Sequence, residues 1–227
     1  MEENVQNDYY LPRRHLIFQE FDRHAKSWQP FLAADYGHET AAHILSEAKR
    51  EEAEIIATLP YIGGDSNPMT RHLIRSGTSL ALYKAMRAEG KSDREVGRLI
   101  YRSVCSSVRK LPSSSFVLTK TFIAKEKKRA KLSRQRQYPG DWVWEFVAGT
   151  DVYGYDFLEC GTQKWYAKHD ALEFLPFYCF LDFVTHRTRG WGFHRTKTLS
   201  EGSDRCNFRW IKGGSTIKGW PPPFLRE

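Results

Sequence analysis

Residues 142–160 have the sequence WVWEFVAGTDVYGYDFLEC, in which two stretches rich in aromatic and β-branched residues flank a glycine-containing connection. Such residues favour extended backbone, and a short connection between two such stretches is typical of a β-hairpin. Trp142–Val147 and Tyr153–Cys160 are therefore predicted to pair as antiparallel strands, with a turn around Gly149 and Thr150.

A second hairpin is predicted near the C-terminus, where Trp191–Leu199 and Arg205–Lys212 are joined by the turn sequence SEGSD. Residues 165–185 lie between the hairpins and have helical periodicity, with Pro176 placed to start a second helical piece. The C-terminal half is thus expected to run strand–strand–helix–strand–strand. The tail GWPPPFLRE is expected to be extended, because consecutive prolines cannot continue a helix.

The N-terminal half has the spacing of amphipathic helices. Helices are predicted for residues 15–28, 39–57 and 68–89, and Asn67 followed by Pro68 is a typical start for the third of them. Ser92 and Glu95 have the spacing of a capping box, which opens a fourth helix. The fold class is therefore predicted to be α+β, a helical half followed by a small antiparallel sheet.

The length of 227 residues suits one sizeable core and is too short for two large domains. The aromatic share of 14% excludes intrinsic disorder, because these side chains bury large areas. A single domain over residues 1–227 is therefore predicted. Its parts are a helical half at 9–111, a basic loop or helix at 112–140, a sheet-containing half at 141–212 and a tail at 213–227.

The net charge of +8 comes almost entirely from one segment. Between Lys120 and Gln137 there are eight lysine or arginine residues and one glutamate. Such a block is typical of a solvated helix or loop. Phe122 is its single aromatic residue, so the base-stacking pattern of single-strand binders is weak. We do not expect a nucleic-acid partner.

The N-terminal residues are polar and do not have the pattern of a secretory signal or transit peptide. The longest apolar run, Phe174–Leu181, has eight residues, whereas a membrane span needs about 20. A cytoplasmic protein without membrane contact is predicted. The four cysteines form no C-x-x-C pair, and in a reducing compartment they are expected to be free thiols.

Three cysteines are expected within the C-terminal part: Cys160 at a strand end, Cys179 early in a helix and Cys206 on the last strand. Asp182 follows Cys179 by three residues, so the two are predicted to share one helical face in an apolar stretch. A carboxylate there must be paired, for instance with Arg195, or its pKa rises. A structural explanation stays open, because buried cysteines often act as small hydrophobes.

The run FLECGTQKWYAKHDALEFLPFYCFLDF at 157–183, followed by RTKTLSEGSDRCNFRW at 195–210, resembles the L-2-amino-thiazoline-4-carboxylic acid hydrolase family. YYLPRR, IGGDSN and ALYKAMRAEGKSDREVGRLIY are similar as well, so the resemblance covers about residues 9–210. Asn207 stands where the family pattern has Asp, and the basic segment looks like an insertion or variant loop. The matching residues are Cys160, Pro176, Cys179, Asp182, Thr198, Leu199, Gly202, Cys206, Phe208 and Arg209.

The resemblance implies an enzyme that hydrolyses C–N or C–S bonds of a cyclic amidine. The ring is a thiazoline, a lactam or a related heterocycle. The resemblance is also compatible with a related ring-forming or isomerising step in natural-product metabolism. The implied catalytic residues are Cys179, Asp182, Cys160 and Cys206. Either a Cys179 thiolate attacks the substrate, or Asp182 acts as general base on water. On the first mechanism, Cys179→Ser abolishes turnover.

The implied substrate-binding residues are Arg195 or Arg71 for a carboxylate, Asn67 to orient it, and Thr198 and His194. The expected partner is a small-molecule substrate, no cofactor is expected, and the sequence is compatible with a homo-oligomer. The arrangement of the cysteines also resembles that of sensor domains of the 4-vinyl-reductase type. The alternative is therefore a non-catalytic domain that binds a small molecule or zinc.

Overall fold

The computed structural model describes residues 8–108, 117–186, 191–216 and 219–223. The chain forms two compact units. The helical unit comprises the residues up to Ser103 together with Trp165–Tyr178, and the sheet unit comprises Val104–Lys164 and the residues from Cys179 onward. The single domain over residues 1–227 stays a prediction.

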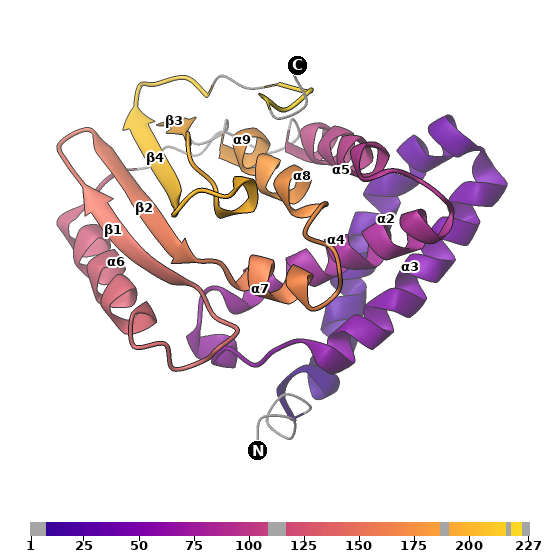
Figure 1. Ribbon diagram of the computed structural model, residues 1–227, viewed down its shortest axis with the longest axis horizontal. Helices are drawn as coiled ribbons and strands as arrows, with labels where there is room; N and C mark the ends of the chain where they lie inside the picture. Colours follow the sequence, from indigo (N-terminus) through magenta and orange to yellow (C-terminus); the bar gives the residue numbers. More distant parts are fainter. Residues whose placement is uncertain (1–7, 109–116, 187–190, 217–218, 224–227) are drawn as a thin grey trace. The chain divides into compact units, whose positions relative to one another are not determined.

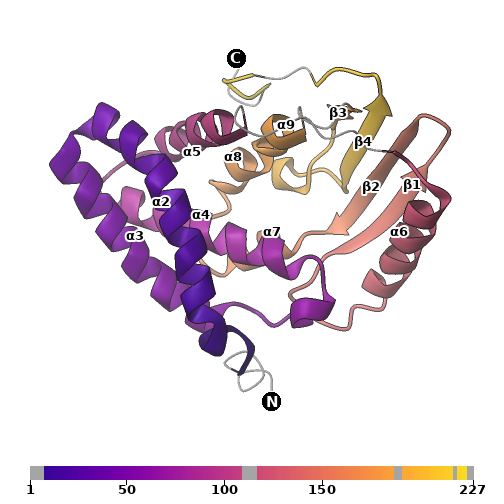
Figure 2. The same ribbon diagram turned by 180° about the vertical axis from the view of Figure 1, so that it is seen from behind.

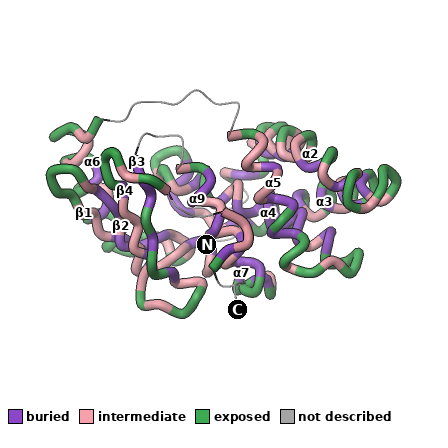
Figure 3. Tube along the Cα trace, turned by 90° about the horizontal axis from the view of Figure 1, so that it is seen from above, coloured by how far each residue is buried: buried purple, intermediate pink, exposed green. Residues whose placement is uncertain are grey.

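The helical unit is built around α3, which packs against both α2 and α4 (Figures 1 and 2). Twelve of the nineteen residues of α4 are buried (Figure 3). Gly77 lies within α4 without interrupting it. A Cβ at this position would lie only 3.0 Å from Ile55 of α3, so the glycine allows the two helices to pack closely. The helices of this unit that begin before Ser103 are η1 (Leu11–Arg13), α2 (Arg14–Tyr36), α3 (His38–Thr58), η2 (Gly64–Ser66), α4 (Thr70–Ala88) and α5 (Asp93–Val108).

The predicted helix starts are confirmed at one place and corrected at another. α4 begins at Thr70 and not at Pro68, so Asn67 is not its N-cap. The Asn67 side chain bonds to the loop instead: its Oδ1 accepts from the Met69 N–H at 2.9 Å. The capping box is confirmed, since the Glu95 carboxylate accepts from the Ser92 N–H at 2.9 Å and from its hydroxyl at 2.7 Å.

Removing this capping box should have a modest effect on stability. We expect Ser92→Ala to lower the free energy of unfolding by about 1 kcal/mol, because the Glu95 N–H at the start of α5 loses its acceptor. Glu95→Gln should cost less, since a glutamine oxygen still reaches the Ser92 N–H. Urea denaturation of both variants tests this order, and equal losses would contradict it.

The sheet unit contains the four predicted strands in one antiparallel sheet of order β1-β2-β4-β3, which confirms the α+β prediction. β2 pairs with both β1 and β4, so the two hairpins form one continuous surface (Figure 1). Three short helices follow β2, where two pieces were expected. These elements are β1 (Val143–Ala148), β2 (Val152–Glu159), α7 (Gly161–Ala167), α8 (Leu175–Phe180), α9 (Asp182–Thr185), β3 (Trp191–His194), η4 (Leu199–Glu201) and β4 (Cys206–Lys212).

β3 ends at His194, five residues before the predicted end of the strand. Beyond this point the side chain of Asn207 replaces part of the backbone ladder, because its Oδ1 accepts from the N–H groups of Thr196 and Lys197 at 3.0 and 2.7 Å. The chain then turns into η4. Arg195 and Thr198 therefore lie on a fixed loop and not on a strand face.

One face of the sheet is aromatic. The register places Tyr153 opposite Trp210, and their rings stack with centroids 5.1 Å apart. α6 (Lys120–Ser133) covers this face through Phe122, which contacts Tyr153, and α9 covers it through Phe183. Cys206 lies on the same face, because side chains two residues apart in a strand point the same way and Trp210 is four residues on.

α6 contains most of the basic segment, and the solvated helix is the form that this segment adopts. Its inner side is anchored by Glu126, which is 6% exposed and accepts from the Tyr155 hydroxyl at 3.1 Å. Five lysines of α6 are exposed. Within the described residues, no helix combines the length and apolar character needed to cross a membrane.

Candidate functional site

The candidate cluster consists of the three C-terminal cysteines, Asp182 and Arg195, all of which belong to the sheet unit. Arg195 bonds directly to the Asp182 carboxylate and to the Cys179 carbonyl. Cys160 directly follows β2, and Cys206 is the first residue of β4, where the register pairs it with Phe157. The meeting of all three thiols in one site, which sequence order alone suggested, stays a prediction.

Cys179 is the penultimate residue of α8, not an early one, and Asp182 begins the next short helix, α9. The prediction that one continuous helix holds both residues is wrong. In a continuous helix the Cys179 carbonyl would accept from the amide four residues later. Here Arg195 Nη2 donates to that carbonyl at 2.9 Å, which accompanies the break between α8 and α9.

Arg195 holds the centre of the cluster. Its side chain is 3% exposed, and Nη1 donates to Asp182 Oδ2 at 2.7 Å. The guanidinium carbon lies 5.1 Å from the ring centroids of both Phe183 and Phe208, a distance at which cations interact with aromatic faces. The pairing of Asp182 with Arg195 that the sequence suggested is thus present. Arg195 Nε is buried and has no hydrogen-bond partner among the described residues.

Burial favours the protonated form of all three thiols of the cluster. Burial raises the pKa of Cys179 far above its ordinary value, and the nearby Arg195 opposes the rise. Burial raises the pKa of Cys206 to about 11, although its sulfur accepts from the Leu199 N–H at 3.2 Å. Burial raises the pKa of Cys160 as well. Burial thus opposes formation of a thiolate, which is the reactive form of cysteine.

Asp182 is the carboxylate of the cluster and is partly accessible. Its side chain is 35% exposed, in contrast to that of Arg195. Burial raises its pKa above the ordinary value, while the charge and hydrogen bond of Arg195 lower it. A carboxyl group that is held in place and accessible, and whose pKa is raised above its ordinary value, can exchange a proton with a ligand.

Sequence comparison identifies the family. The sequence model of the L-2-amino-thiazoline-4-carboxylic acid hydrolase family matches residues 71–210. The chain belongs to this family. The match covers more than half of the chain and includes the whole cluster. No curated protein and no solved structure matches the chain.

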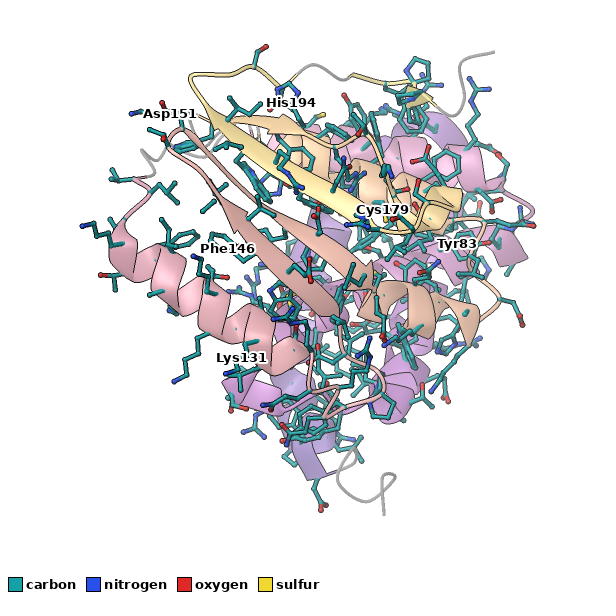
Figure 4. The ribbon with its side chains drawn as sticks, turned by 60° about the vertical axis from the view of Figure 1, so that its left-hand side comes forward. Tyr83, Lys131, Phe146, Asp151, Cys179 and His194 are labelled. Carbon is teal, nitrogen blue, oxygen red and sulfur yellow. The ribbon has the colours of Figure 1, made fainter. Side chains whose placement is uncertain are left out.

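The two remaining candidates of the sheet unit differ in their surroundings. Thr198 is buried within the family match, and its hydroxyl bonds to the N–H and the carboxylate of Glu201 at 3.1 and 2.9 Å, which fixes η4 beside Cys206. His194 is exposed and pairs with Arg209 in the register (Figure 4). It therefore projects to the sheet face opposite Phe193 and Cys206.

Asn67 and Arg71 belong to the helical unit, and their role in substrate binding stays a prediction. Asn67 lies before the family match, and its Nδ2 donates to the Ile62 carbonyl at 2.5 Å, so its amide holds the IGGDSN loop. Arg71 is exposed on the first turn of α4.

The zinc-binding alternative gains no support from the geometry. In the part of the chain that the structure describes, no group of three or more His, Cys, Asp or Glu side chains could hold a metal ion. A shallow groove of about 360 Å³ lies between α6 and β1 and contains none of the predicted site residues (Figure 4 labels Lys131 and Phe146). The groove is lined by Lys127, Ala130, Lys131, Arg134, Glu145 and Phe146.

Sequence reasoning missed the groups that surround the Cys160 sulfur. Burial raises the pKa of Cys160, and hydrogen bonding from the backbone of Gln163 and Thr162 and from the side chains of Trp142 and Thr162 opposes this rise. One signal was available. A cysteine that directly precedes a helix occupies the N-cap position, where a side chain faces the amides of the second and third helical residues.

Proposed function

We propose that this protein is a hydrolase that opens a small cyclic substrate, with a thiol of the cluster as nucleophile and Asp182 as proton-transfer group. The observation that supports this is the grouping of Cys179, Asp182 and the buried Arg195, whose guanidinium bonds to the Asp182 carboxylate and to the Cys179 carbonyl. Such a group set provides a nucleophile, an acid–base residue and a fixed positive charge within one site. The family is named for a hydrolase of a 2-amino-thiazoline carboxylic acid, which is the first substrate to test.

The reaction with a 2-amino-thiazoline balances in two stages. In the first, the cysteine sulfur bonds to the ring carbon between nitrogen and sulfur, and the thiol proton passes to the ring nitrogen. The bond from this carbon to the ring sulfur then breaks, and the released sulfur takes a proton. The enzyme is left bound to the former ring carbon as an S-substituted isothiourea.

In the second stage water adds to the same carbon. The bond to the cysteine sulfur breaks, and the sulfur regains a proton as the carbon becomes a urea carbonyl. Asp182 is suited to take the proton from the attacking water, because Arg195 fixes one of its oxygens while the side chain stays partly exposed. The net reaction consumes one water and produces an N-carbamoyl cysteine.

The test uses the full chain with three probes: 2-amino-thiazoline-4-carboxylate, 2-amino-thiazoline without the carboxylate, and a five-membered lactam. We expect at least one to gain the mass of one water with repeated turnover, and a thiazoline product to give a free thiol. Asp182→Asn should lower kcat about 10²-fold, as expected for loss of acid–base catalysis. Cys105→Ser, a change outside the cluster, should leave the rate unchanged.

Absence of ring opening with all three probes, in a folded protein, would contradict the proposed hydrolase. Binding of a probe without turnover would favour the sensor interpretation. Full activity of Asp182→Asn would remove Asp182 from the chemistry and leave water activation to another group.

A further inference from the structure

The groove between α6 and β1 lies along the outer edge of the sheet. In the part of the chain that the structure describes, β1 pairs with β2 alone. We propose that this edge binds an extended acidic segment of a partner protein, which adds a strand beside β1 and pairs its carboxylates with lysines of α6. None of the cluster residues lines the groove, so the proposal does not depend on the hydrolytic function.

The hydrogen bonds of β1 show which of its backbone groups point away from β2. The Trp144 N–H donates to Ser133 Oγ at 3.1 Å, and the Trp144 carbonyl accepts from the same hydroxyl at 3.3 Å. Because Ser133 belongs to α6, both backbone groups of Trp144 point outward. Every second residue of an antiparallel strand repeats this direction, and the register with β2 has no shift after Trp144. The backbone N–H and C=O groups of Phe146 and Ala148 therefore point outward too.

The edge is closed at Trp144 by the Ser133 side chain, but it is open farther along β1. Phe146 lines the groove of about 360 Å³, and Ala148 is exposed at the end of the strand. Within the described residues, the outward backbone groups of Phe146 and Ala148 have no hydrogen-bond partner. An open strand edge of this kind can pair with the main chain of another extended segment.

α6 places positive charge along this open edge. Lys127 and Lys131 line the groove, are exposed, and have no carboxylate partner among the described residues. Arg134 also lines the groove and pairs with Glu145, the one acidic residue of the lining, at 3.3 Å. The lining thus contains three cations and one carboxylate, which gives a net charge of +2. This charge favours an acidic occupant.

The spacing of the two lysines fits alternate side chains of an added strand. α6 runs alongside β1, because Phe122 near its start contacts Phe146 and Ser133 at its end contacts Trp144 (Figure 4). The lysines are four residues apart on the helix, which places them about 6 Å apart along its axis. Side chains at every second position of a strand are about 6.6 Å apart and point to the same face. Carboxylates at alternate positions of the added strand can therefore reach both lysines.

The same features argue against a second copy of the chain and against a nucleic acid. Two β1 edges that paired with each other would bring two sets of these lysines together, and like charges at an interface repel. A nucleic acid would meet the positive charge but lacks the alternating N–H and C=O groups that pair with a strand edge. The half-buried Phe146 ring already packs against Phe122 and Tyr155, which leaves it poorly placed to stack on a base.

The first experiment measures binding of the full chain to a fluorescent peptide in which glutamate and threonine alternate. We expect the double variant Lys127→Gln/Lys131→Gln to bind this peptide about tenfold more weakly, because two exposed ion pairs are lost. Lys125→Gln/Lys128→Gln is the matched control. It removes the same charge from exposed lysines of α6 outside the groove, and should weaken binding by less than about threefold. Equal losses in the two double variants, or no binding of the peptide by the wild type, would overturn the proposal.

The second experiment tests whether the peptide binds as a strand. An isomer with all its glutamates before all its threonines has the same charge and should bind at least about fivefold more weakly. Two peptides of the alternating sequence, N-methylated at every glutamate or at every threonine, should differ by at least about tenfold, since only one set of amides can face β1. Equal binding of the isomer or of the two methylated peptides would overturn strand addition.

Two further outcomes would assign the edge to another occupant. Binding of a short oligothymidylate as tightly as the alternating peptide would overturn the proposal in favour of a nucleic acid. A concentration-dependent dimer in light scattering, with dissociation on addition of the peptide, would overturn it in favour of a second copy of the chain.

Discussion

Asp182→Ala is expected to lower the free energy of unfolding by about 3–5 kcal/mol, because the change leaves a buried positive charge without its partner. The Arg195 side chain is 3% exposed, and an arginine cannot lose its proton to relieve the penalty. Arg195 Nη1, which donates to Asp182 at 2.7 Å, would lose this acceptor, and only a water molecule entering the site could replace it. Urea denaturation of the variant and the wild type at pH 7 measures the loss.

Removing Arg195 instead of Asp182 should lower the free energy of unfolding by less. Arg195→Met leaves the Asp182 carboxylate, which is 35% exposed and can be hydrated or protonated, and methionine fills much of the space between Phe183 and Phe208. We expect a loss of about 1–2 kcal/mol from the missing charge-assisted hydrogen bonds. The double variant should recover most of the loss caused by Asp182→Ala alone. A larger loss for Arg195→Met than for Asp182→Ala would show that stacking of the guanidinium dominates over the ion pair.

The pairing of Asp182 with Arg195 shows what the sequence could predict about the site. An aspartate in an otherwise apolar stretch requires a partner, and this requirement depends only on local composition. The strands were predictable for a similar reason, because alternating aromatic residues determine both the extended backbone and the buried face. Local sequence thus predicted the ion pair and the strands, whereas the grouping of Cys160, Cys179 and Cys206 in one site stays a prediction.

The missing details all depend on contacts between residues distant in sequence. The end of β3 is determined by the side chain of Asn207, eleven and ten residues from its two backbone partners. The end of α8 is accompanied by a bond from Arg195 to the Cys179 carbonyl, sixteen residues away. A Cβ on Gly161, the residue after Cys160, would lie 2.6 Å from the ring of Trp142, which precedes the first hairpin strand. Helical or strand periodicity contains no information about such contacts.

A second buried carboxyl group, Glu52 in α3, belongs to the helical unit and is remote in sequence from the cluster. It is 1% exposed, and its Oε1 accepts from the Thr78 hydroxyl of α4 at 2.8 Å. Oε2 has no hydrogen-bond partner among the described residues. Burial raises the pKa of Glu52 from 4.5 to about 8, the Thr78 bond opposes this rise, and the negative charge of Glu20 adds to it. Arg75 is already paired with Glu20 at 3.0 Å.

Glu52→Gln is therefore expected to remove a pH dependence of stability. A carboxyl group with a raised pKa in the folded state stabilises the fold fully below pH 4.5, and this contribution is lost as the pH rises through about 8. The wild type should lose roughly 3–5 kcal/mol of unfolding free energy between pH 5 and pH 9 from this group, and Glu52→Gln should not. The two proteins should thus be similar at pH 5, with the variant clearly more stable at pH 9. Glu54→Gln, an exposed change on the same helix, is the matched control and should follow the wild type. Parallel pH profiles for wild type and Glu52→Gln would mean that Glu52 ionises in the folded state as easily as in the unfolded chain, and that water reaches Oε2.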